Sequence, residues 1–229
     1  MKANEIESLF EKYGSNKFMH EYAKIYFSYL EKLKDKKLNI LEIGIADGKS
    51  LKAWSDYFSN STIIGIDIKK IDKNKKGLDK SNIEVYQGSQ SDKKFIEDII
   101  NKYKKFDIII DDGGHTMKQQ QISLGILFFA VKSGGYYVIE DLHTCSGQWD
   151  TLYGYKVIED GDVLTTDLLD SLENKNMNVL ETSYLPKGTV DSIRNKIKSC
   201  ITKIGVESYT NPKGQRYKWP TLLSFMELK

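Results

Sequence analysis

The chain has 229 residues, a length that suits one α/β domain with modest elaboration. Hydrophobic residues make up 40% of it and charged residues 29%, which predicts a folded globular protein and excludes extended disorder. The formal net charge of +2 argues against wholesale nucleic-acid binding. No apolar run approaches the roughly 20 residues of a membrane-spanning helix, and the first ten residues contain no apolar signal core. We therefore expect a cytoplasmic protein with neither a membrane nor a nucleic-acid partner.

Charge is distributed unevenly along the chain. Residues 140–175 contain nine acidic residues and two lysines, whereas residues 187–229 contain nine basic and three acidic residues. The acidic stretch predicts binding of a cation or a polar substrate, and the basic stretch predicts contacts with phosphates. The alternative for both stretches is a solvated surface without a ligand. Two cysteines, Cys145 and Cys200, are too few for a zinc cluster and predict no disulfide in a reducing compartment.

Short β-branched runs alternate with longer amphipathic stretches through the middle of the chain. A helical region at residues 6–34 comes first. Strands are then predicted at residues 38–43, 62–68, 83–87, 107–111 and 136–140, and helices between them at residues 49–57, 92–103 and 118–131. Short apolar strands are typical of sheets covered on both faces, and this alternation indicates parallel pairing through right-handed crossovers.

The last third is predicted to complete the sheet. Helices are expected at residues 166–174 and 190–203, and a strand at residues 179–185 is an open possibility. Residues 206–209 and 222–228 are expected to form an antiparallel pair around the turn at residues 211–214. The predicted fold class is α/β: a Rossmann-like, doubly wound, mostly parallel seven-stranded sheet with a terminal antiparallel strand. Residues 1–36 would form an N-terminal helical cap on a core of residues 37–229, all within one domain.

A glycine loop after the first strand favours a nucleotide cofactor. The loop reads Glu42-x-Gly44-x-x-x-Gly48, and Asp67 ends the second strand nineteen residues later, where it can bind ribose hydroxyls. The dinucleotide fingerprint G-x-G-x-x-G needs a middle glycine, whereas this chain has Ala46. The pattern instead resembles motif I of class I S-adenosylmethionine-dependent methyltransferases. It disfavours a nicotinamide oxidoreductase, and a purely structural glycine turn is the remaining alternative.

A polar loop follows the third strand. In methyltransferases such a loop grips adenine, which makes Gln90 and Asp92 candidate cofactor contacts. A position for Asp92 in the first turn of the next helix, after Ser91 as N-cap, explains that residue equally well.

Acidic residues end the fourth and fifth strands, in the segments IIIDDGGH (residues 108–115) and YVIEDLHT (residues 137–144). If these strands are neighbours, four carboxylates meet at one edge of the sheet and repel one another unless a positive charge neutralises them. A divalent cation, Mg²⁺ or alternatively Mn²⁺ or Fe²⁺, is the economical answer. The candidate ligands are Asp112, Glu140 and Asp141, whereas Asp111 is a candidate to face the cofactor.

Two of the three histidines lie in the same segments. Because histidine accepts a proton near neutral pH, His115 is the preferred general base for a substrate hydroxyl. His143 is a candidate to contact substrate or to support the metal, and local capping or packing is the alternative for each histidine. A metal held by Asp112 would lower the pKa of the hydroxyl and orient it for methyl transfer.

These segments together resemble the metal-dependent sugar O-methyltransferases of the macrocin and mycinamicin type. The resemblance includes YGSNK at residues 13–17 with His20 and Tyr22, then LEIG-x-x-x-G, QGSQSD, IIDDGGH and YVIEDLHT, and a final strand after Trp219 and Pro220. Asn16 stands where the family has an aspartate, although Lys17 could still close over cofactor or substrate. The macrolide enzymes are also longer, so this chain is expected to enclose its substrate differently.

The resemblance implies methylation of a sugar hydroxyl with S-adenosyl-L-methionine and Mg²⁺. It implies Asp112, Glu140 and Asp141 as metal ligands and His115 as base. The cofactor residues that it implies, together with those expected from the loops, are Tyr13, Ser15, Lys17, Glu42, Gly44, Gly48, Ser50, Asp67, Gln90, Asp92 and Asp111.

The acceptor is open at this point. Similar domains decorate sugars of bacterial surface polysaccharides, including capsules, so a nucleotide-linked sugar is expected beside a glycosylated natural product, and a homo-oligomer is possible. The predicted contacts to a substrate diphosphate are Arg194, Lys213, Arg216 and Lys218. The alternatives are a catechol-type or other small-molecule O-methyltransferase and a non-catalytic S-adenosylmethionine-binding module.

Overall fold

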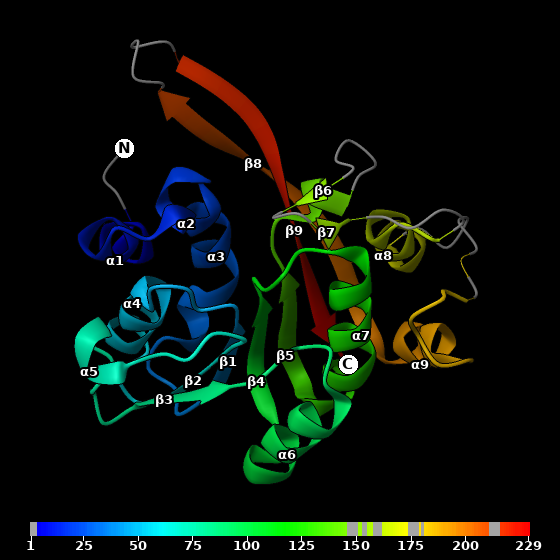
Figure 1. Cartoon of the computed structure of the whole chain (residues 1–229), viewed down its shortest axis with the longest axis horizontal. Coiled ribbons are helices and arrows are strands. Elements are labelled where there is room, and N and C mark those ends of the chain that lie inside the picture. Colours follow the sequence, from blue (N-terminus) through cyan, green and yellow to red (C-terminus); the bar gives the residue numbers. More distant parts are fainter. Residues whose placement is uncertain are drawn as a thin grey trace.

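A seven-stranded sheet in the order β3-β2-β1-β4-β5-β9-β8 runs through the molecule (Figure 1). The computed structural model describes residues 4–145, 151–152, 155–157, 162–173, 179, 181–210 and 216–229. The strands of the sheet are β1 (Asn39–Ile43), β2 (Thr62–Asp67), β3 (Ile83–Gln87), β4 (Phe106–Asp111), β5 (Val131–Ile139), β8 (Ile197–Thr210) and β9 (Arg216–Leu228). A separate small ladder joins β6 (Thr151–Leu152) to β7 (Tyr155–Lys156).

The register places the ends of the central strands side by side. Strands β1 to β5 pair in parallel, and β9 runs antiparallel to both β5 and β8. Ile43 at the end of β1 is opposite Asp111 of β4, which in turn is opposite Ile139 of β5. The residues that follow, Asp112 and Glu140, donate backbone hydrogen bonds to Ile43 and Asp111 and extend this pairing. The two acidic segments therefore meet at one edge of the sheet.

Helices cover both faces of the sheet (Figure 1). One side carries α1 (Glu5–Tyr13), α2 (Asn16–Met19), α3 (Tyr22–Leu30), α4 (Lys49–Tyr57) and α5 (Lys73–Lys76), and the other carries α6 (Lys93–Tyr103), α7 (Met117–Leu127), α8 (Thr165–Glu173) and α9 (Thr189–Lys196). Three short 3-10 helices are η1 (Glu31–Leu33), η2 (Phe128–Ala130) and η3 (Leu142–Cys145). None of the described helices is both long and apolar enough to cross a bilayer.

Alternating side chains of the strands feed two separate hydrophobic cores. Along β4, Ile109 packs into the core beneath α6, α7 and α8, while Ile108 and Ile110 pack into the core beneath α1, α3 and α4. A strand buried on both faces needs an uninterrupted apolar sequence, which is why these strands are recognisable as short isoleucine-rich runs.

The predicted fold class is confirmed, including the parallel order and the terminal antiparallel pair, which is longer than expected. The predicted helix at residues 190–203 is wrong beyond Lys196, because residues 197–203 instead pair with β9. Such long-range pairing outweighs local helix preference. The predicted helix at residues 118–131 ends at Leu127, and β5 begins at Val131. Residues 181–185 form no strand. The predicted turn at residues 211–214 lies outside the described residues, and the division into cap and core stays a prediction.

Candidate functional site

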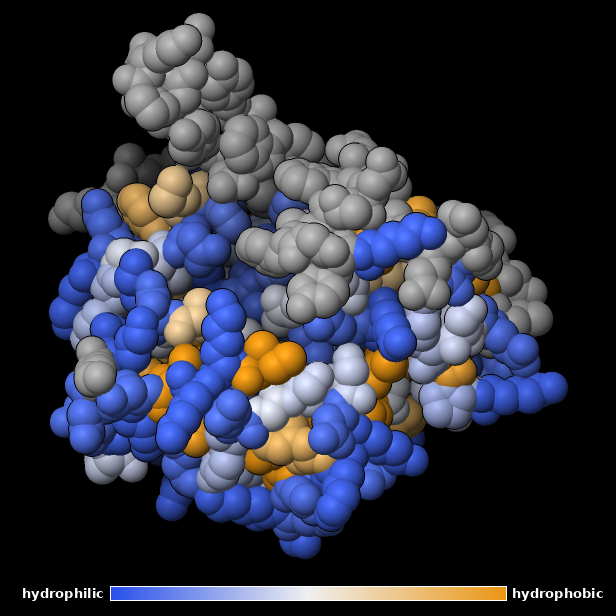
Figure 2. Space-filling view, viewed as in Figure 1, coloured by the Kyte–Doolittle hydropathy of each residue, from blue (hydrophilic) through white to orange (hydrophobic). Residues whose placement is uncertain are grey.

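A cavity of about 820 Å³ opens where the central parallel strands end. The N-terminal segment supplies one wall of this cavity, which includes Gly14 and Asn16. In the space-filling view a hollow with hydrophilic residues around it lies in this region (Figure 2). Five of the predicted cofactor residues line the cavity: Ser15, Gly44, Ser50, Asp67 and Gln90.

The glycine loop lines the cavity, and at Gly44 its backbone closely approaches the backbone of the segment that follows β4. Gly44 has φ +78°, and a Cβ atom on it would lie 2.0 Å from the carbonyl oxygen of Asp112, so only glycine fits. Asp67 fixes the loop from the next strand: its Oδ2 accepts hydrogen bonds from the backbone amides of Ile45 (3.1 Å) and Ala46 (3.0 Å). Ile68 follows Asp67 at the cavity wall and is 66% exposed, an apolar surface suited to a flat ring.

Several predicted cofactor residues lie outside the lining. The hydroxyl of Tyr13 donates to Asp56 of α4 at 2.6 Å and so ties α1 to α4. Gly48 is the N-cap of α4 with φ +71°. Asp92 is itself the N-cap of α6, accepting from the amide of Phe95 at 3.2 Å. The structure thus places these residues in local structural roles.

Asp111 faces α7 rather than the cavity. Its carboxylate accepts hydrogen bonds from the amide nitrogen of Gln90 (3.1 Å) and from the hydroxyl of Ser123. Burial raises the pKa of Asp111 to about 6, although these hydrogen bonds oppose the shift. The amide oxygen of Gln90 accepts from the backbone of Gly114 at 2.8 Å. Gln90 therefore connects the loop after β3 to the diglycine turn after β4.

Asp112, His115 and Asp141 form a compact cluster at the deep end of the cavity. One potential ligand atom from each lies within 4.8 Å of the others, and all three residues line the cavity. His115 Nε2 is 3.7 Å from Asp112 Oδ1 and 3.7 Å from Asp141 Oδ2. Burial alone would raise the pKa of Asp141, but His115 and His20 outweigh it and the pKa is lowered. We call Asp112, His115 and Asp141 the cation cluster.

Glu140, a predicted metal ligand, is not a member of the cation cluster and contacts Lys17 instead. Its Oε1 accepts from Lys17 Nζ at 2.7 Å and from the Tyr26 hydroxyl at 2.5 Å. The same Nζ lies 2.5 Å from Asp112 Oδ2 and 3.2 Å from Glu42 Oε1. Burial and the adjacent Asp112 raise the pKa of Glu140 well above its usual range. Burial opposes the charge on Lys17, yet the surrounding carboxylates raise its pKa. Lys17 thus stays charged beneath the cavity.

The N-terminal helices supply further groups that sequence reasoning did not assign to the acidic residues. The Tyr22 hydroxyl donates to Asp141 Oδ1 at 3.0 Å, and His20 Nδ1 lies 3.6 Å from the same oxygen. Tyr22 and Tyr26 are four residues apart and therefore share one face of α3. This four-residue spacing is the sequence feature that could have indicated a shared role for the two tyrosines. His143 lies on η3, outside the cation cluster and the cavity lining, and its nearby charge helps to lower the pKa of Asp141.

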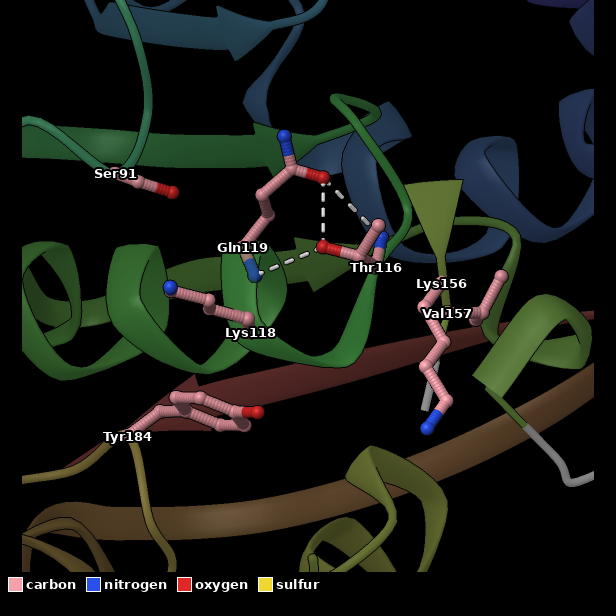
Figure 3. Close-up of a pocket in the computed structure, with 7 residues that line it drawn as sticks. All are labelled: Ser91, Thr116, Lys118, Gln119, Lys156, Val157 and Tyr184. Carbon is pink, nitrogen blue, oxygen red and sulfur yellow. Dashed lines mark hydrogen bonds between the residues drawn. The ribbon is translucent and has the colours of Figure 1, made fainter. Parts of the chain in front are cut away.

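A second cavity of about 350 Å³ adjoins the first at the start of α7, and Gln119 lines both. Figure 3 shows its lining residues, which are Ser91, Thr116, Lys118, Gln119, Lys156, Val157 and Tyr184. Thr116 and Gln119 form a capping box, so the start of α7 is well ordered. Lys118 and Lys156 are the charged residues among these seven, and the hydroxyl of the lining Tyr184 donates to Asp162.

Of the predicted phosphate contacts in the basic tail, the structure describes the side chain of Arg194, which lines neither cavity. Arg194 on α9 donates to Asp191 at 2.7 Å and to the carbonyl oxygen of Val179 at 3.0 Å. Arg216 and Lys218 belong to β9, but their side chains lie outside the description, as does Lys213 altogether.

The donor set at the deep end of the first cavity suits a hard divalent cation. Asp112, His115 and Asp141 form this donor set, and Lys17 contacts Asp112 together with the buried Glu42 and Glu140. Carboxylate oxygens such as those of Asp112 and Asp141 are preferred ligands of Mg²⁺. The wider part of the cavity, with its glycine loop and the Asp67 carboxylate, suits a nucleoside.

Comparison with known proteins adds named relatives. Residues 24–183 match the family described as Rhamnosyl O-methyltransferase/CmcI. The chain is 36% identical over 157 residues to the 8-demethyl-8-(2-methoxy-alpha-L-rhamnosyl)-tetracenomycin-C 3'-O-methyltransferase of Streptomyces olivaceus, covering 64% of this chain and 39% of that enzyme. It is 31% identical over 187 residues to the demethylmacrocin O-methyltransferase of Streptomyces fradiae, covering 76% and 45%. The chain therefore spans less than half the length of these curated relatives.

A solved structure of similar fold is the MycE methyltransferase from the mycinamycin biosynthetic pathway, in complex with Mg, SAH and mycinamycin VI. The TM-score is 0.68 at 25% sequence identity, and the match covers 99% of this chain and 55% of that one.

Proposed function

The chain belongs to the Rhamnosyl O-methyltransferase/CmcI family, and we propose that it transfers a methyl group from S-adenosylmethionine to a sugar hydroxyl with the help of a divalent cation. The cation cluster at the deep end of the nucleoside-sized cavity carries this proposal, because it places two carboxylates and a base beside one reaction volume. The Streptomyces olivaceus relative is by its name a 3'-O-methyltransferase of a rhamnosyl-bearing small molecule, which supports a sugar as acceptor.

S-adenosylmethionine supplies an electrophilic methyl group on a sulfonium centre. We infer that Gly44 and Ser15 hold the amino-acid end of this cofactor and that Asp67 accepts the ribose hydroxyls. The exposed apolar surface of Ile68 supports an adenine site beside Asp67. Gln90 would act on the cofactor through the loop that it holds, since both ends of its amide are bonded internally.

A bound divalent cation would lower the pKa of a coordinated hydroxyl and orient it. Asp112 and Asp141 would hold this cation, and Glu140 stays a predicted third ligand. His115 is the proposed general base: its Nε2 lies 3.7 Å from both carboxylates, whose negative charge stabilises the imidazolium that forms when it takes the hydroxyl proton.

The finer proposal is that the acceptor is a nucleotide-linked sugar, used for a surface polysaccharide or a glycosylated natural product. The second cavity supports this, because its two lysines lie next to the reaction volume and would attract phosphates. Gln119, which lines both cavities, would mark the passage between the sugar and the charged part of the acceptor.

Mass spectrometry of reactions with S-adenosylmethionine, Mg²⁺ and a panel of nucleotide sugars, deoxysugar glycosides and catechols tests the proposal. We expect one methyl group on a sugar, lost on addition of a chelator and in Asp112→Asn. The control variant Asp98→Asn, an exposed aspartate on α6, should retain full activity. A methylated catechol would overturn the acceptor, turnover that ignores the chelator would overturn the metal, and cofactor binding without any product would favour a binding module.

A further inference from the structure

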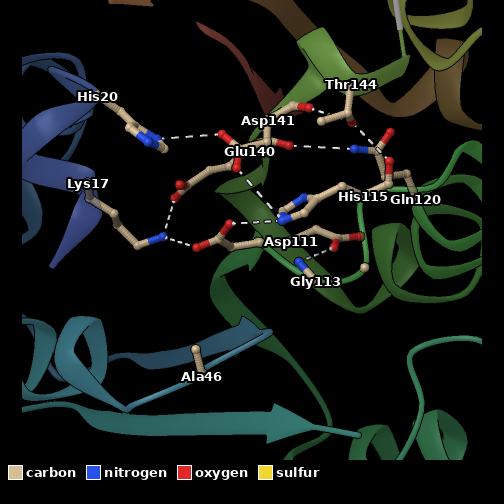
Figure 4. Close-up of polar contacts among 12 residues, drawn as sticks. Lys17, His20, Ala46, Asp111, Gly113, His115, Gln120, Glu140, Asp141 and Thr144 are labelled. Atoms are coloured by element: carbon tan, nitrogen blue, oxygen red, sulfur yellow. Dashed lines mark hydrogen bonds and ion pairs between the residues drawn. The ribbon is translucent and has the colours of Figure 1, made fainter. Parts of the chain in front are cut away.

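Lys17 and His115 lie on opposite sides of a group of acidic residues (Figure 4), and Asp112 is the one that both contact. Lys17 comes from α2, 95 residues before Asp112 in the chain, and its side chain is 1% exposed. The two oxygens of Asp112 are divided between the two sides: Oδ2 is 2.5 Å from Lys17 Nζ, whereas Oδ1 is 3.7 Å from His115 Nε2. Asp112 therefore belongs both to the cation cluster and to the surroundings of Lys17.

The surroundings of Lys17 are a set of buried carboxylates held in place by neutral donors. Glu140 accepts from the Tyr26 hydroxyl at 2.5 Å, and Glu42 accepts from the Ser50 hydroxyl at 2.8 Å. Both glutamates are essentially inaccessible to solvent. A buried charge interacts strongly with its neighbours because water does not screen it. The charge of Lys17 therefore acts on Asp112, and through it on any cation held by Asp112 and Asp141.

We propose that Lys17 is the resident counter-ion of these carboxylates and that it lowers the affinity of the cation cluster for a divalent metal ion. The inference rests on the proposed function only in assigning a divalent cation to Asp112 and Asp141. An ammonium in contact with Asp112 draws negative charge away from the metal and repels it. A site weakened in this way releases its metal ion more readily.

The test is Mn²⁺ binding to the full chain, followed by electron paramagnetic resonance of free Mn²⁺ without acceptor or cofactor. Lys17→Met removes the charge and keeps most of the side-chain volume, so Mn²⁺ should bind at least about tenfold more tightly. Lys17→Arg keeps the charge and should stay within about threefold of the unchanged protein. Lys12→Met is the matched control: Lys12 is an exposed lysine of α1 paired with Asp56, and its loss should leave the affinity unchanged.

If Lys17→Met folds poorly, a second single variant and its combination with Lys17→Met still test the inference, because the combination restores the net charge around Lys17. Glu42→Gln leaves Lys17 with one fewer carboxylate without changing a proposed metal ligand, so Mn²⁺ binding should weaken by about tenfold. Combining it with Lys17→Met restores the original net charge, and the affinity should return to within about threefold of the unchanged protein. A purely structural lysine would give weaker binding in Lys17→Met. That result, or unchanged affinity in both single variants, would overturn the inference.

Failure of this inference is distinguishable from failure of the proposed function. If the unchanged protein binds Mn²⁺ and Lys17→Met does not bind it more tightly, only the role of Lys17 is wrong. If the unchanged protein and Lys17→Met both bind no Mn²⁺, the divalent cation itself is contradicted.

Discussion

His115 and Asp141 adopt a backbone conformation that is unusual for residues with side chains. Their φ angles are +57° and +53°, in the left-handed region where a Cβ atom costs about 1 kcal/mol or more. Each lies in a short segment that follows a buried strand, and His115 Nε2 is 3.7 Å from Asp141 Oδ2. Two members of the cation cluster therefore have strained backbones, and bonds such as that from the Thr144 hydroxyl to the His115 carbonyl oxygen hold them in place.

Asp111 gives a pH-dependent prediction. Its pKa is raised from an ordinary 3.8 to about 6, so between these values the native state binds more protons than the unfolded chain. The contribution of Asp111 to the free energy of unfolding is therefore present at pH 4 and is lost as the pH rises to 6. Asp111→Asn should remove this loss, so its stability relative to the unchanged protein should increase by up to about 3 kcal/mol across that window. Urea unfolding of both proteins at several pH values measures this difference in the free energy of unfolding.

The matched control for Asp111→Asn is Asp98→Asn, which is exposed and should show no such change. A difference between Asp111→Asn and the unchanged protein that stays constant from pH 4 to pH 7 would contradict the buried, destabilising charge.

At the scale of elements, α7 joins the two cavities. Its capping box at Thr116 fixes its first turn directly after the diglycine segment, and Gln119 in that turn lines both cavities. The helix also presents Ser123 to Asp111. The first turns of this helix therefore connect the cation cluster, the buried Asp111 and the second cavity.

The second cavity gives an element-scale prediction. Lys118→Met combined with Lys156→Met removes both positive charges from its lining, so the KM for a nucleotide-linked acceptor should rise by about tenfold or more, with little change in kcat or in cofactor affinity. Steady-state kinetics with acceptor and cofactor varied separately measures this. Lys94→Met, an exposed lysine of α6, is the control. An unchanged KM would mean that the acceptor's charged part does not enter this cavity.

At the scale of the whole molecule, the N-terminal helices close one side of the site. Tyr22 and Tyr26 of α3 reach Asp141 and Glu140, more than 100 residues away in the chain. Tyr26 also packs on Trp54 of α4 and on Phe225 of β9. The N-terminal segment thus forms part of the core and of the site at once.

Tyr26→Phe tests this coupling. The change keeps the ring but removes one of the two buried donors to Glu140, the other being Lys17, so it should lower the free energy of unfolding by about 1–3 kcal/mol. Tyr29→Phe is the matched control on the same helix: its ring stacks on Phe225 at 4.2 Å, and its hydroxyl makes no hydrogen bond that the structure records, so we expect a change within about 0.5 kcal/mol. Chemical denaturation of the two variants measures both values. Equal effects would mean that ring packing, and not the Glu140 contact, anchors α3.

The local sequence pattern was sufficient to predict the strands and helices of the central sheet. Residues 49–57 form the predicted helix, and residues 83–87 the predicted strand, because short apolar runs and amphipathic stretches have only one favourable burial in a sheet covered on both sides. The same logic placed the two acidic segments at one edge, since neighbouring parallel strands end together. Residues 197–203 were mispredicted because their partner, β9, is fixed by pairing and not by local preference.

Sequence alone therefore determined the alternation of parallel strands and helices, the glycine loop and the acidic segments at the ends of two strands, all of which follow from chain-local patterns. Only the tertiary structure decided which way each carboxylate faces. Asp111 turns to α7 and Glu140 turns to Lys17, because each buried charge is satisfied by whichever donor the packing brings within reach. The donor for Glu140 comes from α2, more than 100 residues away, and no pattern along the chain could indicate that contact.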